Sequence, residues 1–186
     1  FENLSRVVAS APTTAAKASI GRTAELSIAK HRELGAAIVE AGGTVAEVME
    51  PYTADIDEFQ RVTLGADWFE SLLTCYLTAG FLDDFFVKLS PGLPAEQAKR
   101  VVAIYAAESG EPLLAEQLQL AIEQQPKLAS RLAMWGRRLV GDTMLVARSA
   151  LHFSEDHKSD EARVEPVFTE LIAAHTRRMD ALGLTA

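Results

Sequence analysis

The sequence has little cysteine and no surplus of positive charge, and each shortage excludes a class of protein. Cys75 is the single cysteine among 186 residues, so a disulfide framework and a cysteine zinc site are excluded. It lies in the apolar run 72–77, where a thiol usually packs as a small hydrophobic group. The 26 acidic residues outnumber the 18 basic ones, leaving a net charge of -8 and no broad basic field for phosphate backbones.

Long uncharged runs and targeting signals are also missing. One of the longest uncharged stretches, residues 71–82, falls short of the roughly 20 residues that a membrane helix needs. The chain begins at Phe1 without a signal-peptide pattern, and residues 1–8 read like the interior of a helix. We therefore expect a cytoplasmic protein without a membrane span, whose first bundle helix is truncated at its N-terminus.

The apolar pattern is helical throughout. Asn-Gly and Asp-Gly hairpin turns are absent, and apolar residues recur at intervals of three and four. This spacing predicts long helices over about 13–42, 67–89, 94–125, 126–153 and 166–182, with short helices between the first two and an exposed loop at 154–160. The length and the apolar content of 48% fit one domain over residues 1–186. The prediction is an all-α, ferritin-like four-helix bundle with an additional C-terminal helix and short connecting helices.

Local signals mark some helix ends. Capping boxes are predicted where a short side chain precedes a glutamate by three residues, at Thr44 to Glu47, Asp55 to Glu58 and Asp67 to Glu70. Gly110 and Pro112 predict a kink, because Pro112 lacks the N–H that would bond the carbonyl of residue 108.

Metal ligands are the first chemistry to look for in such a bundle. Di-iron bundles carry Glu-x-x-His on each of two helices, because side chains at i and i+3 share a face. Here the motif occurs only in halves: His31 follows Ile28, and Glu108 precedes Glu111. We expect His31 on an inward stripe, where it would converge with Glu108 and Glu111 on a single iron or manganese ion. The alternatives are a hydrogen-bonded core histidine and a solvated pair of acids.

Basic residues near Trp135 and the C-terminus form a second candidate site. They are Arg131, Arg137, Arg138, His175, Arg177 and Arg178. RNA contact through Arg137, Arg138, Arg177 and Arg178 is one hypothesis, and ion pairs with the surplus acids are the alternative.

Three segments resemble actinobacterial ferritin-like proteins: residues 48–52, 131–141 and 174–184. That group is similar to the tRNA isopentenyladenosine hydroxylases, which use a non-haem di-iron centre and oxygen. The resemblance implies that His31 and Glu108 are the surviving halves of two Glu-x-x-His motifs, with Ile28 and Glu111 in the lost halves.

The resemblance also implies that the acid from the third helix is lost. Its position falls near Ala79, with Asp83 and Asp84 one turn beyond. The leading hypothesis is therefore a hydroxylase-related protein with a degenerate metal site and a binding or regulatory role. The alternatives are a hydroxylase-like oxidoreductase with one metal ion on His31, Glu108 and Glu111, and a structural homodimer. Catalytic residues and a substrate are not predicted.

Overall fold

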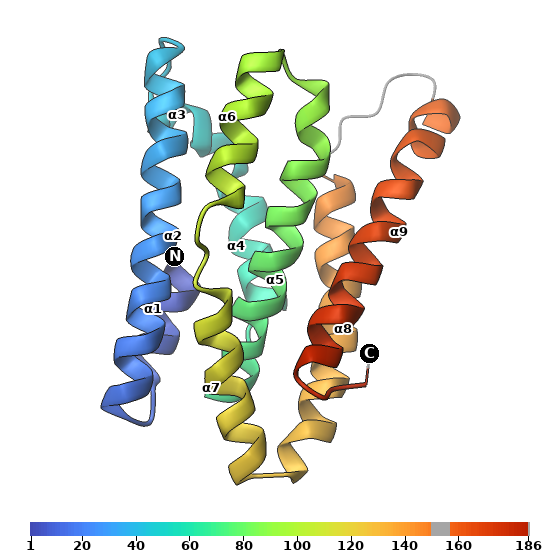
Figure 1. Ribbon diagram of the computed structural model, residues 1–186. Helices are drawn as coiled ribbons and strands as arrows, with labels where there is room; N and C mark the ends of the chain where they lie inside the picture. Colours follow the sequence, from blue (N-terminus) through green and yellow to red (C-terminus); the bar gives the residue numbers. More distant parts are fainter. Residues whose placement is uncertain (150–156, 186) are drawn as a thin grey trace.

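The chain forms a bundle of helices that run alongside one another (Figure 1). The computed structural model describes the backbone of residues 1–149 and 157–185 and the side chains of 1–148 and 164–185. The elements are α1 (Glu2–Ser10), α2 (Thr14–Glu40), α3 (Val45–Met49), η1 (Glu50–Tyr52), α4 (Thr53–Val62), α5 (Trp68–Leu89), η2 (Ser90–Gly92), α6 (Ala95–Ala106), α7 (Glu111–Gln124), α8 (Lys127–Ser149) and α9 (His157–Ala181). All regular structure in this part of the chain is helical, which confirms the predicted all-α class.

Helix α5 is the central element. It packs against α1, α6, α7, α8 and α9, and the helices α1, α2, α7 and α5 form a closed ring of neighbours. These four make the four-helix bundle, and α8 and α9 cover the outer side of α5. A helix with neighbours all round needs no charged face, which explains the uncharged run 71–82. Its large buried side chains include Leu72, Leu77, Phe81 and Phe85.

The start of α5 is capped as predicted. Asp67 Oδ1 accepts a hydrogen bond from the Glu70 N–H at 3.0 Å, and Glu70 Oε2 accepts one from the Ala66 N–H at 2.8 Å. The other two predicted capping boxes are wrong. Thr44 makes no side-chain cap, and Asp55 lies inside α4, because the chain is already helical from Glu50 onward.

The helix predicted over 94–125 is interrupted, and the predicted kink at Gly110 is a complete break between α6 and α7. Gly110 has a φ of 73°, and a Cβ there would overlap Thr23 on α2. Glycine suits this position both because it tolerates the left-handed conformation and because it allows the close approach. Pro112 lies in the first turn of α7, where a missing N–H costs nothing.

Helix α9 begins at His157, well before the predicted Pro166. The predicted loop is therefore wrong for residues 157–160, while 154–156 and the predicted helix end near Phe153 lie outside the described residues. No helix in the described ranges has the length and apolar character to cross a membrane.

Candidate functional site

The three predicted metal ligands are not brought together. His31 is exposed on α2, and Glu108 is exposed in the link between α6 and α7, with its Oε2 3.6 Å from Arg22 Nη2. Glu111, the first residue of α7, is partly buried, and its Oε1 lies 3.2 Å from Arg178 Nε. Across residues 1–148 and 164–185, no three His, Cys, Asp or Glu side chains are grouped so as to hold a metal ion.

The prediction that His31 faces inward is wrong, although the start of the predicted stripe is right. Ile20 and Ala24 are buried as predicted. Further along α2, the side chains that line the bundle cavity are Ser27 and Lys30, while His31 is exposed. The predicted stripe therefore leaves the inward face before it reaches His31.

A cavity of about 90 Å³ lies at the centre of the four-helix bundle. All four helices contribute to its wall: Leu4 from α1, Ser27 and Lys30 from α2, Tyr76 and Asp83 from α5, and Glu111 and Leu114 from α7. Burial raises the pKa of Tyr76 to about 12, so its phenol remains protonated. Its hydroxyl donates to the Arg178 carbonyl at 3.4 Å.

Lys30 supplies one positive charge at this centre. Its Nζ lies 2.5 Å from Asp83 Oδ2, and the two side chains are 15% and 23% exposed. The same ammonium lies 5.4 Å from the centroid of the Tyr105 ring, which adds a cation–π contact. Burial raises the pKa of Asp83 and outweighs the opposite effect of Lys30. The ammonium therefore serves as the local counter-charge for this carboxylate.

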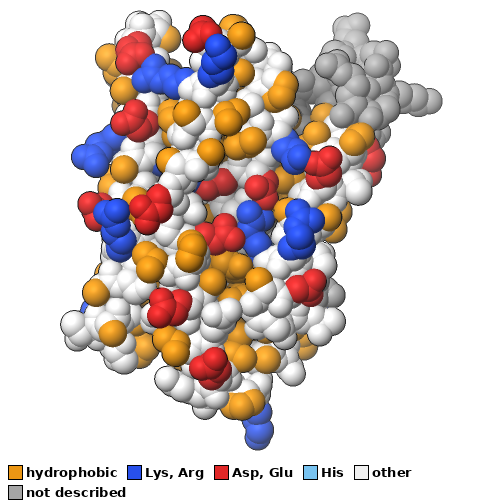
Figure 2. Space-filling model, in the orientation of Figure 1, with side chains coloured by type: hydrophobic (Ala, Val, Ile, Leu, Met, Phe, Trp, Pro, Cys, Tyr) orange, Lys and Arg blue, Asp and Glu red, His pale blue; other side chains and the backbone are white. Residues whose placement is uncertain are grey.

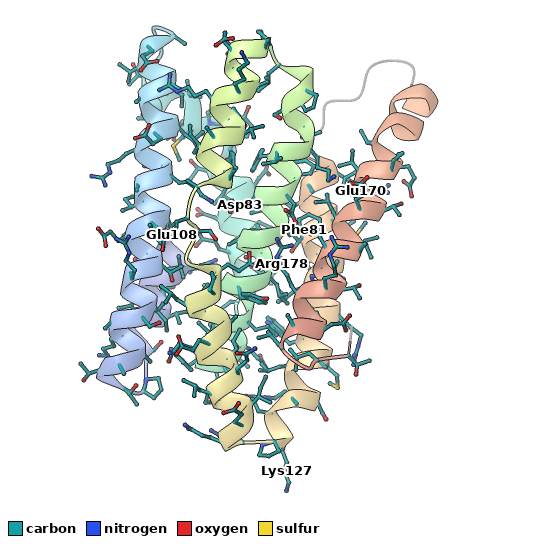
Figure 3. The ribbon with its side chains drawn as sticks, in the orientation of Figure 1. Phe81, Asp83, Glu108, Lys127, Glu170 and Arg178 are labelled. Atoms are coloured by element: carbon teal, nitrogen blue, oxygen red, sulfur yellow. The ribbon has the colours of Figure 1, made fainter. Side chains whose placement is uncertain are left out.

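Arg178 supplies the second positive charge, from outside the four-helix ring. Its side chain reaches from α9 towards α5, where Nη1 lies 2.8 Å from Asp84 Oδ2 and Nε lies 3.2 Å from Glu111 Oε1 (Figure 3). The Arg178 side chain is only 15% exposed. On this face of the molecule, acidic and basic side chains gather at the centre between α6–α7 and α9 (Figure 2).

Gly80 makes room for this guanidinium. A Cβ at position 80 would overlap Nε, Cζ and Nη2 of Arg178. Glycine inside a helix is about 1 kcal/mol less favourable than alanine, so its presence in the strongly apolar α5 indicates a close approach by another group. Gly80 did not enter the prediction from sequence, but a glycine inside this apolar helix is a signal that could have indicated an inserted side chain. RNA contact and ion pairs with the surplus acids were the two alternatives for Arg178, and its contacts with Asp84 and Glu111 are ion pairs of the second kind.

The residues at the bundle centre do not fit a di-iron centre. In ferritin-like di-iron proteins two helices carry Glu-x-x-His and the other two a glutamate. The residues with that spacing at this cavity are Ser27 and Lys30 on α2, Glu111 and Leu114 on α7, and the pairs Tyr76 and Ala79 and Gly80 and Asp83 on α5, and none of these pairs is Glu-x-x-His. No histidine lines the cavity as the structure describes it. The carboxylates present already bind Lys30 and Arg178, whose charges would repel a divalent ion.

The remaining basic candidates make contacts within the chain. Arg131 pairs with Asp67 at 2.5 Å, and Arg137 donates to the Thr185 carbonyl at 2.5 Å. Arg138 pairs with Asp142 at 3.4 Å and lies 5.1 Å from the Trp135 ring centroid. The alternative of ion pairs with the surplus acids therefore describes Arg131 and Arg138, while Arg177 is exposed.

His175 is not part of a surface cluster either. It is 4% exposed and forms a hydrogen bond with the backbone of Gly136, and its Nε2 has no hydrogen-bond partner within the described side chains. Burial, with a further contribution from Arg178, lowers the pKa of this imidazole. His175 is therefore a neutral core histidine at neutral pH.

The comparisons with known proteins agree with this architecture. A family model described as "Ferritin-like domain, actinomycetes" matches residues 1–159. No curated protein matches the sequence. The match covers the four bundle helices and the whole of α8, which is far more than half of the chain. The chain belongs to the actinomycete ferritin-like domain family.

Proposed function

We propose that this protein is a ferritin-like binding or regulatory module in which protein cations hold the bundle centre in place of metal ions. The observation that carries the proposal is the position of Arg178. Its side chain fills the space that the missing side chain of Gly80 leaves on α5, here called the Gly80 notch, and its guanidinium forms ion pairs with Asp84 and Glu111. In this view the chain is related to the non-haem di-iron tRNA hydroxylases by descent and does not share their oxygen chemistry. It is one domain whose metal site has degenerated.

The charge balance supports this proposal. Partly buried carboxylates without a cation are costly, and metal ions meet that need in a di-iron bundle. Here Lys30 neutralises Asp83, and Arg178 serves both Asp84 and Glu111. The three carboxylates and two cations leave a local charge of only -1, so each carboxylate has a cation partner without a metal ion.

Metal analysis of protein purified without chelator tests the proposal. We expect substoichiometric iron and manganese, and a thermal unfolding midpoint that does not change when either ion is added. The competing hypothesis is a hydroxylase-like oxidoreductase with one ion on His31, Glu108 and Glu111. It predicts about one iron or manganese ion per chain, lost in Glu108→Ala.

Glu25→Ala is the matched control for Glu108→Ala. Both carboxylates pair with Arg22, and their side chains are 64% and 66% exposed. Loss of a bound ion in Glu108→Ala with retention in Glu25→Ala would establish the enzyme hypothesis and remove the one proposed here.

RNA contact stays a proposal for Arg137, Arg138 and Arg177. If these side chains dock a phosphate backbone, Arg137→Ala with Arg138→Ala should weaken tRNA association and reduce the salt slope by about one per lost contact. Unchanged binding and an unchanged slope would dispose of the idea.

Self-association is proposed through the outer face of α8. Met134 and Leu145 are 66% and 69% exposed there, and Gly141 between them opens the backbone to approach. Sedimentation equilibrium of the wild type and of Met134→Glu with Leu145→Glu tests this. A monomer at all concentrations in the wild type would exclude the homodimer.

A further inference from the structure

A second, larger cavity lies away from the bundle centre, between α1 and the start of α5. Its volume is about 210 Å³, below the roughly 300–1,000 Å³ of sites for drug-sized ligands. The wall includes Asn3, Arg6 and Val7 from α1, Leu64 from the turn before α5, and Trp68 and Ser71 from α5. The size restricts any occupant to a small molecule.

The shape of this cavity is fixed by bonds between its walls. The Trp68 indole N–H donates to the Val7 carbonyl at 3.0 Å and ties α5 to α1. The turn at Gly65 lies so close to α5 that a Cβ there would overlap the backbone of Glu70 and Ser71. Thr74 Oγ1 donates to the Thr63 carbonyl at 3.1 Å and holds the other end of the turn. The cavity is therefore preformed.

Two charged residues line the cavity, and only one of them is neutralised. Asp67 caps α5 through Oδ1 and lies 2.5 Å from Arg131 through Oδ2. Arg6 bonds the side-chain oxygen of Asn3 at 3.3 Å, and in the described ranges no carboxylate lies within ion-pair distance of its guanidinium. The uncompensated charge at the cavity is therefore positive, although the chain as a whole carries -8.

We infer that this cavity is a binding site for a small organic carboxylate. Arg6 would hold the carboxylate, because a guanidinium presents paired N–H donors that match two carboxylate oxygens. The Asn3 amide on α1 and the Ser71 hydroxyl on α5 also line the cavity and offer further donors. Val7, Leu64 and the Trp68 ring give an apolar surface for a short aliphatic chain or an aromatic ring. This wall favours an organic acid over inorganic phosphate.

Fluorescence of Trp68 provides the test. The chain has two tryptophans, so Trp135→Phe leaves Trp68 as the single reporter, at the cavity wall. Benzoate and butyrate are titrated into this variant, with benzamide and inorganic phosphate as matched probes. Calorimetry on the wild-type chain with the same probes does not depend on the substitution. We expect saturable binding of benzoate or butyrate and weaker binding of benzamide and phosphate.

Arg6→Gln should weaken carboxylate binding roughly tenfold or more, the effect of losing a charge-assisted hydrogen bond. Lys17→Gln, an exposed cation on α2 that does not line the cavity, should leave the affinity unchanged. The inference is overturned if neither acid binds saturably, if benzamide binds as tightly as benzoate, or if Arg6→Gln binds as the wild type does. Tighter binding of phosphate would replace the organic acid with an inorganic anion.

Discussion

The bundle centre and the cavity beside α1 differ in whether their positively charged side chains are paired with carboxylates. At the centre, Lys30 and Arg178 bind carboxylates of the same chain, and the guanidinium fills the notch that Gly80 leaves. At the edge, Arg6 borders an open cavity beside a carboxylate that Arg131 already neutralises. A charge that the fold itself balances is structural, while a charge left unbalanced at a preformed cavity is available to a ligand. The comparison therefore separates a centre whose charges pair within the chain from a candidate binding site.

The largest effect is expected at the bundle centre. Arg178→Ala leaves Asp84 and Glu111 without their cation and opens the notch at Gly80. We expect a loss of about 2–3 kcal/mol in the free energy of unfolding, measured by urea denaturation. Arg177→Ala, at the neighbouring exposed position, should change it by less than about 0.5 kcal/mol. Equal effects of the two substitutions would show that the guanidinium is a surface charge.

A smaller effect is expected at the other central cation. Lys30→Met keeps most of the aliphatic stem but removes the charge beside Asp83, and should cost about 1–2 kcal/mol in the same assay. Lys17→Met is the exposed control on the same helix. If Lys30→Met is as stable as the wild type, Asp83 does not need the ammonium. Lys30 would then no longer count as one of the two protein cations proposed to take the place of metal ions.

The smallest expected effect is a pH dependence from His175. Its pKa in the folded protein lies below the usual 6.5, so as the pH falls below 6.5 the unfolded chain takes up a proton before the folded one does. The contribution of this group to stability is therefore intact above pH 6.5 and is lost as the pH falls. His175→Asn should flatten the dependence between pH 7 and 5, and His31→Asn, at an exposed position, should not. An identical slope in both variants would contradict the assignment.

A feature of the fold or the site could be predicted from the sequence when the residues that determine it lie close together in the chain. The cap at Asp67 and the ends of α2 follow from residues close together in sequence, and the structure confirms them. Gly110 and Pro112 located the irregularity correctly, although it is a break between two helices and not the predicted kink. The inward phase of α2 was predicted correctly at Ile20 and Ala24 but not at His31. There the inward positions are the polar Ser27 and Lys30, which an apolar pattern does not reveal.

The role of Arg178 was also out of reach of local patterns. It pairs with Asp84 across 94 residues of sequence, and an arginine on an amphipathic helix normally keeps its head in water. Gly80 could have indicated a close approach but would not have identified the approaching group. Ser27 and Leu114 occupy cavity positions at which a Glu-x-x-His motif would place its glutamate and its histidine. These positions could be identified only from the structure, in which four helices surround one cavity.

A double-mutant cycle of Gly80→Ala and Arg178→Ala tests the central claim most directly. In the wild type, alanine at position 80 should displace the guanidinium and destabilise the fold despite its better helix propensity. In the Arg178→Ala background the notch is empty, so the same substitution should stabilise the protein by up to about 1 kcal/mol. This reversal of sign in the unfolding free energy is what the account predicts. The same change in both backgrounds would mean that Arg178 does not occupy the bundle notch, and would contradict it.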